Sequence, residues 1–430
     1  MSLKQRTSNP ALWVPTVYFG MGLPFVAISV ASVLMFTNMG ISDSKIAFWT
    51  SLVMLPWTLK PLWSGFLEMF KTKKFFVVFT EILSSVLFGL IALSLPLPNF
   101  FTYAIALMGI LAFSGASHDI AGDGVYLAFL DKKQQAQFIG WQGASYNIAK
   151  ILTSGGLVYI AGSLESSVGV VKAWMVIMFI CALIMFTLGM YHIRILPTED
   201  NSERKVSTAR DAFIALWEVI RTFFQKKYIW FHIIFIILYR FAEGFAVKIV
   251  PLFLNASRDV GGLGLSTKDI GLVYGAAGPA AFVLGSILGG YFISYLGLKR
   301  SLIYLWGAFN IPFIAYLLLA VFRPENLFVI GGGVAVEYFG YGFGFVGLML
   351  FMMQQVSPGK HQMAHYAFAT AIMNLGVMLP SMASGYLSDW LGYKSFFIWV
   401  LIATIPAFLV TVFVPFVYPD HKDDKVRVRK

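Results

Sequence analysis

The chain has 430 residues, of which 58% are hydrophobic and only 12% are charged, and its mean hydropathy is +0.75. Soluble domains carry roughly 25% charged residues, so this composition excludes an ordinary soluble fold and predicts a membrane protein. The single cysteine, Cys181, excludes a disulfide framework and a cysteine-rich metal site.

Apolar segments of about 20 residues, the length that crosses a bilayer, follow one another along the chain. They predict twelve helices, at residues 11–38, 45–68, 75–96, 100–130, 134–162, 170–195, 228–254, 267–295, 299–321, 326–356, 361–388 and 394–417. We therefore expect an all-α membrane protein with twelve transmembrane helices.

Lys and Arg are distributed unequally over the loops between these helices. With the N-terminus in the cytoplasm, 22 of the 32 fall in cytoplasmic segments and only six in external ones. This bias follows the positive-inside rule, so we expect a multi-pass protein with both termini in the cytoplasm. The net charge of +11 then reflects membrane topology, and we expect no nucleic-acid partner.

The most highly charged segment, 196–227, divides the chain into two halves. We expect an N-terminal six-helix bundle over 1–196, a cytoplasmic linker over 197–227 and a C-terminal six-helix bundle over 228–430. In the linker, Phe213, Leu216, Trp217, Ile220 and Phe224 recur at helical intervals, which predicts an amphipathic helix lying on the cytoplasmic membrane face.

The two halves show weak internal similarity. A shift of 227 positions matches Gln135 and Asn147 in the fifth predicted helix to Gln362 and Asn374 in the eleventh. Repeats of this kind are typical of secondary transporters, in which related bundles surround one central site. The predicted bundles are therefore pseudo-symmetric.

Charged residues inside the predicted helices are candidates for function. Nine such residues occur, namely Lys60, Glu81, Asp119, Asp123, Lys150, Arg240, Glu243, Lys248 and Glu337. Each costs roughly 2.5–3.5 kcal/mol at a helix centre, so we expect them to face a cavity or one another. Structural ion pairing is the alternative for every one, and we assign Glu81, Lys150 and Lys248 to it.

Three of these residues lie near the membrane midplane. At about 1.5 Å per residue, Arg240 and Glu337 each lie roughly 18 Å along their helices, and Asp119 lies near the middle of its own. Arg240 and Glu243 are three positions apart, which predicts a local ion pair. Depth and helix position therefore favour Asp119, Arg240 and Glu337 as functional residues.

Asp119 and Asp123 are four positions apart, so they lie on one helical face. Two carboxylates close together in a low dielectric favour a state in which one holds a proton near neutral pH. Lys60 has a similar depth to Asp123, and we expect an ion pair between them. His118 precedes Asp119 and could join a proton relay, although adjacent helical residues point in different directions.

Glycine, acidic and basic residues recur at two predicted cytoplasmic turns, and this pattern resembles the signature of the major facilitator superfamily. Ser294 stands where the second turn would have its acid. The predicted latch residues at these turns are Gly65, Glu68, Lys73, Gly289, Gly290 and Arg300. No GxxxxGK[ST] motif occurs, which argues against an ATP-driven pump.

Seven stretches in the expected order resemble the muropeptide permease (AmpG) branch of this superfamily. They are YFGMGLPF, LPWTLKPLW, DIAGDGVYL, LYRFAEGFA, IGLVYGAAG, VEYFGYGFG and HYAFATAIMNLG. By this resemblance, Lys60, Asp119, Asp123, Glu243 and Glu337 stand where the family has Lys or acids. Arg240 stands where a Lys is expected.

The resemblance implies an importer of anhydro-sugar fragments of peptidoglycan, driven by inward proton movement across the bacterial inner membrane. Asp119, Asp123 and Glu337 would couple protons by alternating access. Substrate would be bound by Arg240, Glu243, Lys60, Asn147 and Asn374. We expect an anionic amino-sugar or muropeptide as substrate, lipid as surroundings, a monomer, and no cofactor or metal.

Other functions remain as alternatives. The same fold could export solutes, or carry a sugar, a drug or an acyl-CoA, and a sensor would be expected to carry an additional soluble domain. An intramembrane enzyme is not expected, because no HExxH motif or Ser–His constellation lies at membrane depth. His361 and His365 have metal-ligand spacing, but no acid or cysteine is near them in sequence.

Overall fold

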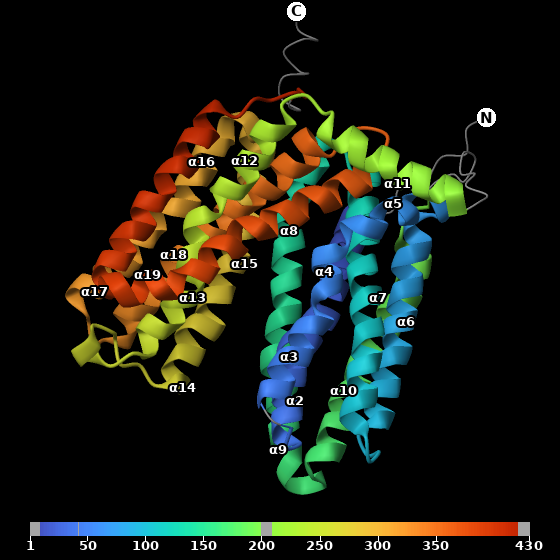
Figure 1. The fold of residues 1–430 in the computed structure, drawn as a ribbon, viewed down its shortest axis with the longest axis horizontal. Coiled ribbons are helices and arrows are strands. Elements are labelled where there is room, and N and C mark those ends of the chain that lie inside the picture. Colours follow the sequence, from blue (N-terminus) through green and yellow to red (C-terminus); the bar gives the residue numbers. More distant parts are fainter. Residues whose placement is uncertain (1–8, 42, 199–208, 420–430) are drawn as a thin grey trace, which may run out of the picture. The chain divides into compact units, whose positions relative to one another are not determined.

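The computed structural model describes residues 9–41, 43–198 and 209–419, and within these residues it contains helices and no strand (Figure 1). Eight helical stretches are long and apolar enough to cross a membrane. One of them, α19 (Gln362–Phe413), contains two predicted spans joined at Gly392, whose φ of 70° interrupts the helix. Three more spans consist of shorter helices, which completes the expected twelve and confirms the all-α class.

In the first half of the chain, the described residues form ten helices. They are α1 (Pro10–Val26), α2 (Ser32–Asn38), α3 (Asp43–Val53), α4 (Leu55–Leu59), α5 (Pro61–Phe70), α6 (Lys73–Ser94), α7 (Phe100–Phe129), α8 (Lys132–Ile151), α9 (Val158–Val168) and α10 (Val170–Ile195). Short π-helical turns join α1 to α2 and α8 to α9.

The second half supplies α11 to α19. Besides α19, these are α11 (Ala209–Phe224), α12 (Ile229–Tyr239), α13 (Phe241–Asn255), α14 (Thr267–Ile270), α15 (Gly278–Leu296), α16 (Leu298–Asn310), α17 (Ile314–Phe322) and α18 (Leu327–Phe351). A π-helical turn, Gly271–Ala277, joins α14 to α15, and another, Met352–Val356, extends α18.

Two helix breaks coincide with charged residues. Lys60 separates α4 from α5, where Pro61 lacks the backbone N–H that would continue the helix. Arg240 separates α12 from α13 and has φ −102° and ψ 7°, in the sparsely populated region between strand and helix. Discontinuous helices commonly form binding sites in transporters, and the carbonyls of Lys60 and Arg240 here accept from the backbone N–H of Ser64 and Gly244.

The chain forms two compact units. The first comprises the chain up to Phe129, Ser145–Ile220 and His361–Ala367, and the second comprises Leu130–Ala144, Arg221–Lys360 and the chain from Phe368 onward. The beginning of α8 therefore belongs with the second unit and the beginning of α19 with the first.

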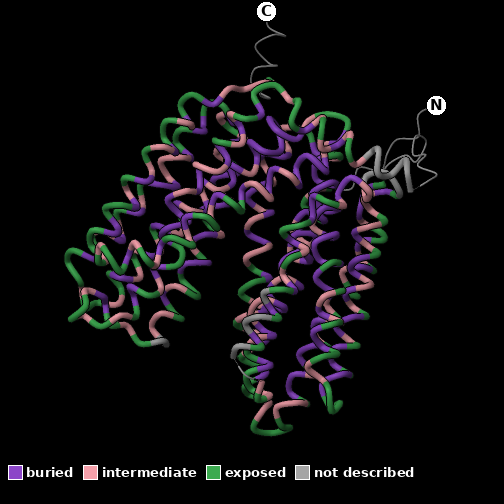
Figure 2. The backbone as a smooth tube through the Cα atoms, in the orientation of Figure 1, coloured by how far each residue is buried: buried purple, intermediate pink, exposed green. Residues whose placement is uncertain are grey.

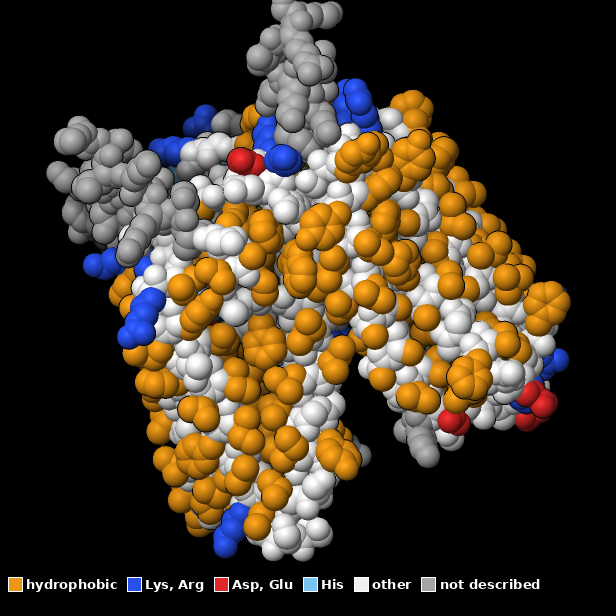
Figure 3. Space-filling model, turned by 180° about the vertical axis from the view of Figure 1, so that it is seen from behind, with side chains coloured by type: hydrophobic (Ala, Val, Ile, Leu, Met, Phe, Trp, Pro, Cys, Tyr) orange, Lys and Arg blue, Asp and Glu red, His pale blue; other side chains and the backbone are white. Residues whose placement is uncertain are grey.

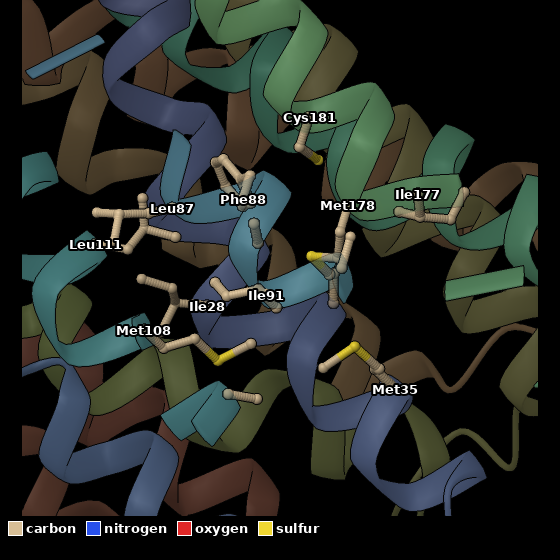
Figure 4. Packing of buried hydrophobic residues seen from close by; sticks show 14 of the residues in the cluster. Ile28, Met35, Leu87, Phe88, Ile91, Met108, Leu111, Ile177, Met178 and Cys181 are labelled. Carbon is tan, nitrogen blue, oxygen red and sulfur yellow. The ribbon is translucent and has the colours of Figure 1, made fainter. Parts of the chain in front are cut away.

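Each unit has its own apolar core. In the first, Ile28 and Met35 meet Phe88 of α6, Met108 of α7 and Met178 of α10 (Figure 4). In the second, the core is made by residues of α13, α17, α18 and α19. Figure 2 shows the buried residues on the inward sides of the helices within each unit.

The outer surface of each unit is largely apolar, with charged side chains mainly toward its ends (Figure 3). Large side chains such as Leu183, Tyr159 and Phe328 are 65%, 78% and 92% exposed. A water-soluble protein would bury most such side chains, whereas lipid solvates them. The distribution agrees with the membrane protein expected from composition.

The amphipathic helix expected at 210–224 is present as α11. Its Val219 and Phe223 are fully buried, whereas Trp217 is 62% exposed. The side chain of Phe213 lies outside the described residues. Val219 and Phe223 therefore pack on the protein, whereas Trp217 and Phe224, two residues of the stripe predicted to face the membrane, are exposed.

Lys226, in the turn between α11 and α12, supports a test of stability against pH. Its Nζ donates to the carbonyl oxygens of Pro358 at 2.5 Å and Ser357 at 3.4 Å, and burial lowers the pKa of Lys226 to about 8. Free lysine titrates near 10.4, so between these values the unfolded chain binds more protons. Stability from this group therefore increases as pH rises through the window.

We expect Lys226→Met to remove this increase, measured as the slope of the thermal unfolding midpoint against pH in detergent. Lys227→Met is the matched control, because Lys227 is exposed and should leave the slope unchanged. An unchanged slope in Lys226→Met would show that the buried amine does not titrate in this window.

Candidate functional site

Two predicted acids in the first unit lie on α7 and are held by aromatic residues from other helices. Tyr18 of α1 donates from Oη to Oδ1 of Asp123 at 2.8 Å. Trp57 of α4 donates from Nε1 to Oδ2 of Asp119 at 3.1 Å. Asp123 is 8% exposed, and Oδ1 of Asp119 is buried with no hydrogen-bond partner among the described residues.

Lys60 lies at the break between α4 and α5 and is 8% exposed. Its positive charge acts on both Asp119 and Asp123. The expected ion pair with Asp123 is nevertheless wrong, since Lys60 makes no salt bridge with any residue that the structure describes. Asp123 instead accepts a hydrogen bond from the Tyr18 hydroxyl on α1. The spacing of residues within α7 gives no information about contacts with α1.

His118 points away from Asp119, as expected for adjacent helical residues. Its Nε2 lies 3.1 Å from Oε1 of Glu81 on α6, and Nδ1 of His192 on α10 lies 2.8 Å from the same oxygen. Glu81 is fully buried. Glu81, for which we expect structural ion pairing, thus contacts two histidines, and these contacts are ion pairs when an imidazole is protonated.

In the second unit, Arg240 and Glu243 form the ion pair predicted from their spacing. Nε of Arg240 donates to Oε2 at 2.6 Å and Nη2 donates to Oε1 at 2.7 Å. This is the bidentate geometry that binds a carboxylate most strongly. Nη2 also lies 3.4 Å from Oη of Tyr341, and the guanidinium lies 5.0 Å from the ring centre of Phe345.

Glu337 is 6% exposed and lies on α18, four residues before Tyr341. Tyr316 of α17 donates from Oη to Oε2 of Glu337 at 2.8 Å. The rings of Tyr274 and Tyr338 meet edge to face with centres 5.2 Å apart. Glu337 therefore lies among tyrosines and has no cationic partner among the described residues.

A pocket of about 410 Å³ lies beside Arg240 in the second unit. Arg240, Lys248, Asn374 and Ser381 provide its polar groups, and the rest of the lining is Val247, Val377, Met378 and Met382. Its volume falls within the roughly 300–1,000 Å³ of small-molecule sites. The structure thus brings together Arg240 and Asn374, two residues expected to bind substrate.

Lys150 and Lys248 do not have the ion pairs expected of them. Both side chains are exposed from the protein, and neither makes a salt bridge within the described part of the chain. Lys248 instead lines the pocket. Asn147 lies half-buried on α8 in the first unit.

The predicted latch residues are dispersed. Gly65 packs on Val219 of α11, and Gly289 lies against the carbonyl of Phe343 on α18. Gly290 lies against the backbone of Gly140 on α8, while Lys73 is half-buried and Arg300 is exposed. The side chain of Glu68 lies outside the described residues.

Sequence reasoning missed four aromatic residues that hold the acids and the arginine, namely Tyr18, Trp57, Tyr316 and Tyr341. Each lies on a different helix from the group it contacts. A chain with this many aromatic residues gives no signal that separates these four from packing residues.

The fold and site can be compared with known proteins. The family model described as Major Facilitator Superfamily matches residues 16–360. An uncharacterised protein of Haemophilus influenzae is 26% identical over 407 residues, 91% of each chain. The anhydromuropeptide permease of Escherichia coli is 23% identical over 403 residues, covering 91% of this chain and 77% of the permease.

Among solved structures, the fucose:proton symporter of Escherichia coli superimposes with a TM-score of 0.68 at 13% identity, covering 94% of this chain and 97% of the symporter. At that identity the similarity establishes the fold. Together with the family match over most of the chain, it shows that this protein is a membrane transporter and belongs to the major facilitator superfamily.

Proposed function

We propose that this protein is a proton-coupled importer of peptidoglycan-derived anhydro-muropeptides or related anionic amino sugars, working by alternating access in the bacterial inner membrane. The observation that carries the proposal is the cationic pocket beside Arg240. The permease of Escherichia coli, which is named for anhydromuropeptides, supports this substrate class. The similarity to a fucose:proton symporter supports a sugar-sized solute and proton coupling.

The pocket is suited to a carboxylate on an otherwise polar ligand. Nε and Nη2 of Arg240 donate hydrogen bonds to Glu243, while Nη1 has no partner among the described residues. A guanidinium carries five N–H donors, so Nη1 can donate to a ligand without breaking the pair with Glu243. Lys248 adds a second positive charge in the same pocket, and Asn374 offers an amide for hydroxyl groups.

The proposed proton carriers are Asp119, Asp123 and Glu337. Glu337 and Asp119 each accept a hydrogen bond from a neutral donor, and neither forms an ion pair with a described residue. A proton can therefore neutralise Glu337 without removing the partner of a cation, and it can neutralise Asp119 while Asp123 remains near Lys60. Neutralisation favours a state in which the acid is more deeply enclosed, which is how protonation shifts a population between two conformations.

Glu337→Gln tests the proton step. We expect the variant to lose gradient-driven uptake of labelled anhydro-muramyl sugar by about 5- to 150-fold, the range of typical coupling free energies, while exchange of labelled for unlabelled substrate continues. Asp119→Asn should behave in the same way. Exchange needs a binding site and conformational change but no net proton movement, so it separates coupling from binding.

Glu325→Gln is the matched control, because Glu325 is an exposed acid just before α18, the helix that carries Glu337. It should retain both activities. Full response of Glu337→Gln and Asp119→Asn to the proton gradient would disprove the proton assignment. Uptake in inverted vesicles rather than right-side-out ones would disprove import and favour an exporter.

A further inference from the structure

Glu81 is a fully enclosed ionisable group of the first unit, and the proposed transport mechanism does not use it. Its side chain is fully buried on α6. Nδ1 of His192 on α10 lies 2.8 Å from Oε1 and 2.9 Å from Oε2, and Nε2 of His118 on α7 lies 3.1 Å from Oε1. On the other side of the His192 ring, Nε2 lies 2.8 Å from Oγ1 of Thr16 on α1. We call these four residues the Glu81 cluster.

The hydrogen-bond pattern allows the cluster to hold one proton more than it carries when Glu81 is ionised and both histidines are neutral. Oγ1 of Thr16 lies 3.1 Å from the carbonyl oxygen of Trp13, which can only accept. The Thr16 hydroxyl can donate there, or to the carbonyl oxygen of Leu12 at 3.3 Å, and its oxygen then accepts from Nε2–H of His192. Alternatively, the hydroxyl donates to Nε2 itself at 2.8 Å. An ionised Glu81 can also only accept, so Nδ1 must donate as well. In the first arrangement both His192 nitrogens carry a proton, or Glu81 itself is protonated. In the second arrangement His192 is neutral, with its proton on Nδ1.

Release of that proton requires only that the Thr16 hydroxyl turns, because its oxygen is already within hydrogen-bond distance of His192 Nε2. His192 could keep Nδ1–H toward Glu81 only if Nε2 accepted from Thr16, whose hydroxyl would turn away from the Trp13 carbonyl. A net negative charge would also remain on Glu81, whose described partners are the two histidines and include no Lys or Arg. An unpaired buried charge costs several kcal/mol, so a bound proton that neutralises the cluster stabilises it.

The surroundings enclose this proton. Gly20 brings the backbone of α1 so close that an added Cβ would lie 3.2 Å from Oε1 of Glu81. Gly189 of α10 closes the opposite side, because its Cβ would lie 3.5 Å from that of Glu81. The titratable groups that face Glu81 are His118 from α7 and His192 from α10, while α1 contributes only the neutral Thr16.

The cluster is connected through two helices to the acids of the proposed site. Thr16 lies two residues before Tyr18, which holds Asp123, and His118 immediately precedes Asp119. Nδ1 of His118 is buried with no described partner, as is Oδ1 of Asp119. A change at Glu81 that moves α1 or α7 therefore alters the contacts of both aspartates.

We propose that the Glu81 cluster is a proton-binding site that takes up and releases one proton during transport. The capacity to bind the proton rests on the hydrogen-bond geometry, which accommodates the cluster with and without it. Its exchange during transport rests on the proposed proton coupling. The site is separate from Asp119, Asp123 and Glu337, and its ligand is the proton itself, held between a carboxylate and an imidazole.

A difference titration tests proton binding without any transport assay. Purified wild-type protein and the double variant Glu81→Gln/His192→Asn are titrated in detergent over about pH 5 to 8, where imidazole charge changes. We expect the wild type to bind one proton per molecule more than the variant. Equal numbers of bound protons would overturn the proposal, because the cluster would then keep one fixed protonation state as a structural ion pair.

One control variant and one alternative variant accompany this titration. Ser84→Ala removes a buried hydroxyl that pairs with Ser114 at 3.0 Å between the same helices α6 and α7, and it should titrate like the wild type. Glu81→Gln alone should also lose the extra proton, and it replaces the double variant if the latter does not fold as a monodisperse protein.

Transport measurements then test the exchange of this proton. With labelled anhydro-muramyl sugar in vesicles, His192→Gln should lose the stimulation of uptake by a pH gradient and retain substrate exchange. Undiminished stimulation in His192→Gln would overturn the role in transport. Absence of stimulation in the wild type would instead contradict the proposed proton coupling, and the titration result would be unaffected.

Discussion

Replacing Arg240 with methionine should abolish uptake and reduce the stability of the protein by about 3–5 kcal/mol, the usual cost of removing one partner of a buried ion pair. Arg240 is 8% exposed and Glu243 is 6% exposed. Without the guanidinium, the carboxylate of Glu243 is left buried beside Tyr341. The loss is measured as the decrease in the denaturation midpoint in detergent, alongside uptake of labelled substrate.

A double variant separates stability from function. Arg240→Met/Glu243→Leu removes both charges, and replacing a buried ion pair by apolar residues is often neutral or stabilising. We therefore expect stability to return close to that of the wild type while uptake stays absent. Recovery of uptake in the double variant would show that Arg240 serves packing rather than substrate binding.

Arg240→Lys is the conservative control. It keeps a positive charge but cannot donate two parallel hydrogen bonds to Glu243 or stack as a plane on Phe345. We expect partial stability and reduced uptake. An Arg240→Lys variant that matches the wild type in both would indicate that charge alone is needed at this position.

The sequence predicts the helices better than it predicts the site. Twelve apolar segments determine the spans, because lipid requires each segment to satisfy its own backbone. The i,i+3 pair of Arg240 and Glu243 was also predictable, since neighbours within one helix follow from its period. The bend at Lys60 follows from the proline after it.

Contacts between helices could not be predicted in this way. Asp123 was expected to pair with Lys60 because their depths are similar, but depth leaves the rotation of each helix undetermined. Tyr18 reaches Asp123 from α1, and Glu81 meets His192 from α10. Such contacts depend on how the helices pack against one another, which a single sequence does not specify.

Small residues determine part of this packing. The second large effect that we predict is the loss of stability on replacing Gly342. A Cβ at Gly342 would lie 2.2 Å from the carbonyl oxygen of Phe282 and 3.0 Å from the backbone nitrogen of Ser286. Both atoms belong to the backbone of α15, so no side-chain rotation can relieve the clash. We expect Gly342→Val to force α15 from α18 and to destabilise the protein at the upper end of about 1–3 kcal/mol.

The same change should impair transport, because Gly342 adjoins Tyr341, whose ring packs on Phe282 at 4.9 Å between centres. Separation of α15 from α18 removes this contact and with it the support of Tyr341 beside Arg240. Gly332→Val is the matched control on the same helix, since nothing lies within 4 Å of a Cβ at Gly332. It should leave the unfolding midpoint and uptake near wild-type values. Equal losses in the two variants would mean that valine disturbs α18 itself, whereas a loss confined to Gly342→Val identifies close approach of the two backbones as the feature that holds the site together.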